Sequence, residues 1–118
     1  MILITGITED DRRERIKALA NIPKSYTDAK LDKIIDNADD IAQVRMQTEI
    51  PSRTLIVVSN LICAKLIRQG LPDSADEVRS LEDQIMKIIE SHNDKAPEQN
   101  AGTVLVTSGI GEGRGTFG

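Results

Sequence analysis

Aromatic residues are almost absent from this chain of 118 residues, since Tyr26 and Phe117 are its only aromatics and there is no tryptophan. Proteins that bind single-stranded nucleic acids or sugars use aromatic rings as stacking platforms, so this shortage argues against both functions. The hydrophobic content of 39% must therefore come mainly from Ile, Leu, Val and Ala. A chain of this length is expected to form one domain with a modest core.

Cysteine, histidine and basic charge are also scarce. Cys63 lies in an apolar run, so we expect a buried, reduced thiol and an intracellular protein without disulfides. His92 has no second histidine or cysteine near it in the sequence, so we expect no metal site and no cofactor. Asp and Glu outnumber Lys and Arg by 19 to 15, a net charge of −4 that disfavours general binding to nucleic acid.

Long apolar runs and catalytic motifs are missing as well. No stretch approaches the length of a membrane span, and the opening "MILITG" is too short for a signal peptide, so we expect no membrane association. Gly113, Gly115 and Gly118 match G-x-G-x-x-G, but no helix follows to hold a phosphate. Ser59 and Ser74 have no recognisable base. We therefore expect that the chain is not an enzyme.

The middle of the sequence predicts four helices. The first begins after a cap at Thr8 and ends near Ala20, with Glu9 and Arg13 at the four-residue spacing of helical ion pairs. The second is expected over about 27–48, the third over about 52–69 and the fourth from a cap at residue 73 or 74 to about residue 91. His92 would then lie at the end of the last helix, where a cation suits the helix dipole. A polar linker follows.

The helices differ in how far apolar residues extend around them. The second has one apolar face (Leu31, Ile34, Ile35, Ala38, Ile41 and Ala42), and the fourth has one stripe (Ala75, Val78, Leu81, Ile85, Ile88 and Ile89). Apolar residues cover every side of the third helix, which therefore has to be buried on more than one flank. Two interpretations are equally open: a central core helix, or a helix that uses Val57, Val58 and Leu61 against another subunit.

Acidic residues form a stripe along the second helix. Its members recur about every four residues and are Asp28, Asp32, Asp36, Asp39 and Asp40. Like charges at this spacing repel, so either the stripe is a solvated face or a partner compensates it. Arg12, Arg13, Arg15 and Lys17 of a neighbouring copy could supply that compensation. The stripe is thus a candidate intersubunit or channel-facing surface.

Both ends of the chain look extended. Residues 1–5 and 103–107 have the composition of short strands, and five glycines follow the second one. Ordering so many glycines is unfavourable, so contacts have to hold this tail. We expect the tail to add a strand to a neighbour or partner, or to pair with residues 1–5. The candidate contact residues are Thr103, Val104, Leu105, Val106, Thr107, Ile110, Arg114 and Phe117.

These patterns predict a mainly α fold: a small four-helix bundle with short extended or β-strand segments at both termini. Residues 1–93 would form the helical domain, and residues 94–118 a linker and an extended C-terminal arm. Association through protein contacts is the expected mode of action.

The element order and three motifs resemble a known viral family. "ITEDDRRERIK", then "DAKLDKIIDNADDIAQ", then "RTLIVVSNLICAKLIRQGL" and a last amphipathic helix are similar to the head–tail connector, or adaptor, proteins of tailed bacteriophages and related archaeal viruses. The resemblance covers residues 7–92. The strand-like N-terminus and the glycine tail have no place in the family pattern.

This resemblance implies a structural protein of the virion neck, assembled in the host cytoplasm. Family members form a homo-oligomeric ring, usually a dodecamer, below the portal protein. The ring extends the DNA channel, lets genomic DNA pass without reading its sequence, and docks neck or tail completion proteins. The rival hypothesis is a small helical interaction or regulatory module that acts as a dimer.

Overall fold

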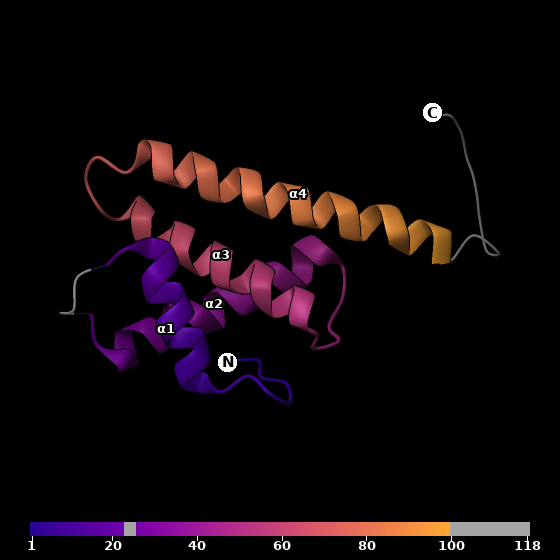
Figure 1. Cartoon of the computed structure of the whole chain (residues 1–118), viewed down its shortest axis with the longest axis horizontal. Helices are drawn as coiled ribbons and strands as arrows, with labels where there is room; N and C mark the ends of the chain where they lie inside the picture. The colour runs from indigo at the N-terminus through magenta and orange to yellow at the C-terminus, as the bar shows by residue number, and fades with distance from the viewer. Residues whose placement is uncertain (23–25, 100–118) are drawn as a thin grey trace.

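The computed structural model describes residues 1–22 and 26–99, with side chains up to residue 93. Four helices make up the fold: α1 (Glu9–Ala20), α2 (Asp28–Met46), α3 (Arg53–Gln69) and α4 (Ala75–Gln99). Figure 1 shows α4 running along α3, with α1 and α2 on the other side of α3. The described part of the chain is therefore mainly α, as the sequence predicts.

Side-chain caps fix the start of each of the first three helices. The Thr8 hydroxyl accepts a hydrogen bond from the Asp11 amide at 3.1 Å, and the Asp11 carboxylate accepts one from the Thr8 amide at 2.9 Å. Thr27 caps α2 and Ser52 caps α3 through their hydroxyl groups. These bonds satisfy amides that have no partner inside the helix. The predicted starts of all three helices are confirmed.

Helix α4 differs from its predicted end. It begins after Ser74, whose carbonyl accepts a hydrogen bond from the Val78 amide, but it continues to Gln99 rather than ending near residue 91. Polarity alone does not stop a helix, and Pro97, its strongest breaker, comes only two residues before the end. His92 consequently lies inside the helix, not at its C-terminus, and the predicted linker is helical up to residue 99.

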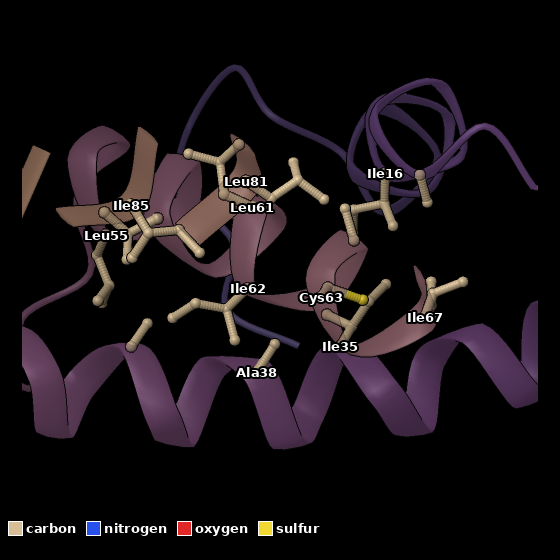
Figure 2. Packing of buried hydrophobic residues seen from close by; sticks show 14 of the residues in the cluster. Ile16, Ile35, Ala38, Leu55, Leu61, Ile62, Cys63, Ile67, Leu81 and Ile85 are labelled. Carbon is tan, nitrogen blue, oxygen red and sulfur yellow. The ribbon is translucent and has the colours of Figure 1, made fainter. Parts of the chain in front are cut away.

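Helix α3 is the centre of the molecule, because it packs against each of the other three helices. Figure 2 shows Leu55, Ile62 and Cys63 of α3 among side chains from α1, α2 and α4. The predicted faces of α2 and α4 are turned toward this core, with Leu31, Ile35, Leu81 and Ile85 buried. Burial of α3 on several flanks is confirmed, and helices of its own chain provide it.

The N-terminal segment does not form the predicted strand. Among the described residues its β pairing is one isolated antiparallel bridge between Ile4 and Ile7, around a turn at Thr5 and Gly6. Gly6 has φ of 91°, a left-handed value that side chains with a Cβ rarely adopt. The segment is thus a tight turn ahead of α1, and its predicted pairing with residues 103–107 lies outside the described residues.

Candidate functional site

An open groove lies over α3, because α1 and α4 both pack on α3 while, within the described residues, no Cα of α1 lies within 8 Å of a Cα of α4. The α3 side chains form its floor, α1 and α4 form its walls, and the turn at Gly6 and Ile7 closes one part of its rim. Its volume is about 400 Å³. The lining residues are Gly6, Ile7, Asp11, Arg12, Arg15, Leu19, Arg53, Ile56, Val57, Asn60, Leu61, Gln84 and Ile88. We call this surface the groove.

The groove combines an apolar floor with a basic rim. Val57 is 41% exposed on the floor, beside the buried side chains of Ile56 and Leu61. Arg15 and Arg53 are exposed at the rim, and neither forms an ion pair with a described residue. The one carboxylate of the lining, Asp11, is engaged with the Thr8 amide. Apolar side chains next to guanidinium groups are typical of protein interfaces.

A buried polar cluster supports the groove from below. Arg12 is fully buried, and its guanidinium group pairs with the carboxylate of Asp39 at 2.9 Å. It also donates to the Asn60 side-chain oxygen at 2.9 Å and to the Ser59 hydroxyl at 2.9 Å. The Ser59 hydroxyl donates in turn to Asp39 at 2.5 Å. One arginine therefore ties α1 to α2 and α3, which fixes the groove wall on its floor.

The same cluster holds the N-terminal segment. The Ile2 amide donates to the Asp39 carboxylate at 2.7 Å, and the Ile2 carbonyl accepts from Arg12 at 3.0 Å. Both backbone groups of Ile2 are thus bound by the buried ion pair, much as a neighbouring strand would bind them. This anchoring sets the position of the turn at Gly6 and Ile7 on the groove rim.

The acidic stripe of α2 is mostly neutralised within one chain. The Asp32 carboxylate accepts two hydrogen bonds from Arg13, at 2.8 and 2.7 Å, and these bonds lower the pKa of Asp32. Asp28 lies 3.6 Å from the Lys17 ammonium group, and Asp36 lies 2.6 Å from the Met1 amine. The basic helix does compensate the stripe, but the two helices belong to the same chain rather than to neighbouring copies.

Asp40 is the member of the stripe that no described ion pair involves, and it lies in a second candidate surface. The surface spans the end of α2 and the loop before α3. Val44 and Ile50 are 76% and 73% exposed there, more than any other large hydrophobic side chain in the described part of the chain. The lining residues are Asp40, Gln43, Val44, Gln47, Thr48, Glu49 and Ile50. We call this surface the acidic patch.

Four of the predicted interface residues line the groove, namely Arg12, Arg15, Val57 and Leu61. Arg15 and Val57 are exposed there, whereas Arg12 and Leu61 are buried within their own chain. Val58 is fully buried in the core of its own chain, which leaves it no surface for a partner. Arg13 faces α2 instead, where it binds Asp32. The predicted tail residues lie outside the described residues; they are Thr103, Val104, Leu105, Val106, Thr107, Ile110, Arg114 and Phe117.

Sequence reasoning missed the polar half of the site. Ser59 and Asn60 interrupt the otherwise apolar run of α3, and both are buried. A polar pair inside such a run indicates a buried hydrogen-bond partner, here Arg12, so a signal was present. Arg53, Val44 and Ile50 carried no comparable signal, because single charged or apolar residues near helix ends are common on any surface.

The remaining reactive side chains lie apart from the groove lining. Burial raises the pKa of the Cys63 thiol to about 12. His92 lies half-buried in a surface hollow beside Thr54 and Ser91. Among the side chains that the structure describes, in residues 1–22 and 26–93, no three of His, Cys, Asp or Glu lie close enough to hold a metal ion. No helix in the described residues combines the length and apolarity that a membrane span requires.

The fold and the groove define a class: a small, mainly α, four-helix protein with an open apolar and basic surface on its central helix. Comparison with protein-family models, curated proteins and solved structures finds no match to this chain.

Proposed function

We propose that this protein acts by binding other proteins through the groove, as a ring-forming head–tail connector of a tailed virus. The open surface on α3 carries this proposal. Val57 lies 41% exposed between α1 and α4, beside the buried side chains of Ile56 and Leu61, at a place where a bundle would ordinarily cover its central helix. A partner that covers this surface would complete the packing of α3.

The resemblance of residues 7–92 to connector proteins supplies the viral part of the proposal. Subunits of such a ring need a rigid body with surfaces for neighbours, for the portal and for neck or tail components. The buried Arg12–Asp39 pair and the capped helices provide the rigid body. The groove and the acidic patch provide two surfaces of opposite charge.

Passage of DNA through such a ring requires a wall that does not hold the phosphate backbone. The acidic charge of the subunit suits this role, because carboxylates repel phosphates. Asp28 and Asp36 are the stripe residues outside the acidic patch that keep most of their side chains exposed, at 62% and 63%. We expect Asp28→Lys together with Asp36→Lys to slow genome release.

Removal of the protein from the virus tests the proposal. Loss of the coding sequence should give heads that package DNA but lack tails, because the joint between head and tail is missing. Substitution of Val57 by Asp should give the same defect through the groove alone. Arg79→Glu is the matched control, since Arg79 is 74% exposed on α4 and lies outside the groove. Tailed, infectious particles without the protein would contradict the proposed role.

The rival hypothesis of a dimeric regulator predicts a different assembly. A regulator of this size should be a stable dimer at micromolar concentration, whereas a connector subunit should assemble fully only where a ring can close. Native mass spectrometry of the purified chain separates the two outcomes, and a dimer that does not change with protein concentration would favour the regulator.

A further inference from the structure

The groove and the acidic patch carry opposite charges, and each of them exposes apolar side chains. The groove carries Arg15 and Arg53 at its rim, with Asp11 as its one carboxylate. The acidic patch carries Asp40 and Glu49 and has no cationic residue in its lining. Opposite charges at two surfaces of one molecule favour contact between unlike surfaces and oppose contact between like ones.

The apolar parts of the two surfaces also correspond. In the acidic patch, Val44 and Ile50 project toward the solvent, and 76% and 73% of their surface is exposed. The groove offers about 400 Å³ over Ile56 and Val57, room enough for aliphatic side chains. Exposed apolar side chains of this size gain most by entering an apolar pocket that excludes water.

The two surfaces lie on different parts of the molecule and share no lining residue. Asp40 and Val44 are on the side of α2 away from Ala38 and Ala42, which pack into the core against α3. The groove lies on α3 between α1 and α4. One copy can therefore use both surfaces at once, each with a different neighbour.

We propose that the acidic patch of one copy docks in the groove of the next, with Ile50 on the apolar floor and Asp40 and Glu49 near Arg15 and Arg53. The contact is head-to-tail, so repetition closes a ring if the rotation between copies fits and otherwise extends a filament. The proposal rests on the proposed ring assembly, and it names the surfaces that form the ring.

The size of the contact sets its expected strength. A standard interface uses roughly 20–30 residues a side, more than either of these surfaces offers. Two copies alone should therefore associate weakly. A closed ring should be more stable than a pair of copies, because each copy in the ring uses both the groove and the acidic patch. The contact that closes the ring joins copies already held together, so it costs little further loss of rotational freedom.

Disulfide trapping between chains tests the docking directly. The Ile50→Cys chain and the Val57→Cys chain are mixed and oxidised, and one of the two is labelled with nitrogen-15. The mass of each disulfide-linked dimer then shows which two chains it contains. We expect the mixed dimer of one Ile50→Cys and one Val57→Cys chain as the main product. Cys63 is buried, so it should contribute little background.

Lys33→Cys with Val57→Cys is the matched control, because Lys33 is exposed on α2 but lies outside the acidic patch. Equal yields from both mixtures, or no mixed dimer at any protein concentration, would overturn the docking proposal. The second result is also expected if residues 100–118 of the same chain occupied the groove.

Reversal of the rim charges gives a second readout. Arg15→Glu with Arg53→Glu should lower the yield of mixed dimer at least about tenfold, because two favourable charge contacts become repulsive. An unchanged yield would contradict the proposed charge pairing. A chain that forms the mixed dimer but is missing from purified virions would leave the docking intact and overturn the role at the head–tail junction.

Discussion

Single residues decide how the first helix is attached to the body. Arg12 is one of three arginines within four residues, and the sequence does not distinguish it from Arg13 or Arg15. The structure does: Arg12 is fully buried against Asp39, Arg13 binds Asp32, and Arg15 faces the groove. Each step of about 100° around the helix axis turns the side chain toward a different neighbour.

Replacement of Arg12 by Met should lower the free energy of unfolding by about 3–5 kcal/mol, because Asp39 would remain buried without its cation. Arg15→Met on the same helix is the control and should change stability by about 0.5 kcal/mol or less. Urea denaturation measures both. An Arg12→Met protein as stable as the Arg15→Met protein would show that the buried pair does not hold α1.

A double-mutant cycle measures the interaction energy between Arg12 and Asp39 separately from their interactions with other residues. Asp39→Asn removes the charge and keeps one oxygen, which can accept from either the Ile2 amide or the Ser59 hydroxyl, since these two groups donate to different carboxylate oxygens. The combined Arg12→Met and Asp39→Asn protein should lose less stability than the sum of the two single changes, since the second change removes the uncompensated charge. Simple additivity of the two losses would contradict direct coupling.

Cys63 should be protected from thiol reagents in the folded protein. Its pKa is raised to about 12 by burial, so the reactive thiolate is scarce at pH 8, and its side chain is fully covered. Labelling by an aromatic disulfide should be roughly a thousandfold slower in the native than in the unfolded protein. Complete labelling within the mixing time without denaturant would contradict the packing of α3.

At the scale of elements, the hydrophobic pattern predicted most of what is observed. The starts of α1, α2 and α3 and the buried faces of α2 and α4 follow from caps and from apolar spacing. The end of α4 was not predictable in this way, because no residue between 91 and 96 forces a helix to stop. The partners of the acidic stripe depend on how α1 packs against α2, which spacing within one helix does not specify.

Glu82 connects three helices through charge. Its carboxylate lies 2.8 Å from Arg45 of α2 and 2.8 Å from Lys65 of α3. Hydrogen bonds from Arg45, supported by Lys65, lower the pKa of Glu82 to about 2. The ionised form is therefore favoured by folding, and its contribution to stability is present above the ordinary pKa of 4.5 and is lost as the pH falls toward 2.

The free energy of unfolding of the Glu82→Gln protein should consequently decrease less than that of the unchanged protein as the pH falls from 4.5 to about 2. At neutral pH the change should lower the free energy of unfolding by about 1 kcal/mol, as expected for a partly exposed pair. Glu90→Gln, an exposed site on the same helix, is the control. Thermal unfolding followed across this pH range measures the effect, and equal acid sensitivity of the Glu82→Gln and unchanged proteins would contradict it.

At the scale of the whole molecule, the other three described helices cover most of α3 and leave Val57 partly exposed in the groove. The sequence predicted that α3 needs several partners, but it did not show which flank its own chain leaves open. That depends on α1 and α4 lying apart, a property of the tertiary arrangement. Arg15 and Val57, far apart in the chain, meet in the groove for this reason.

The most direct test of the account is the mass of assemblies formed by charge-reversed chains. One chain carries Asp40→Lys and Glu49→Lys in the acidic patch, and the other carries Arg15→Glu and Arg53→Glu in the groove. Native mass spectrometry follows each chain alone and an equimolar mixture over a series of protein concentrations. We expect each variant alone to stay monomeric, while the mixture regains the assembly of the unchanged chain with the two variants alternating. Variants that assemble alone as well as the unchanged chain does, or a mixture that stays monomeric, would contradict it.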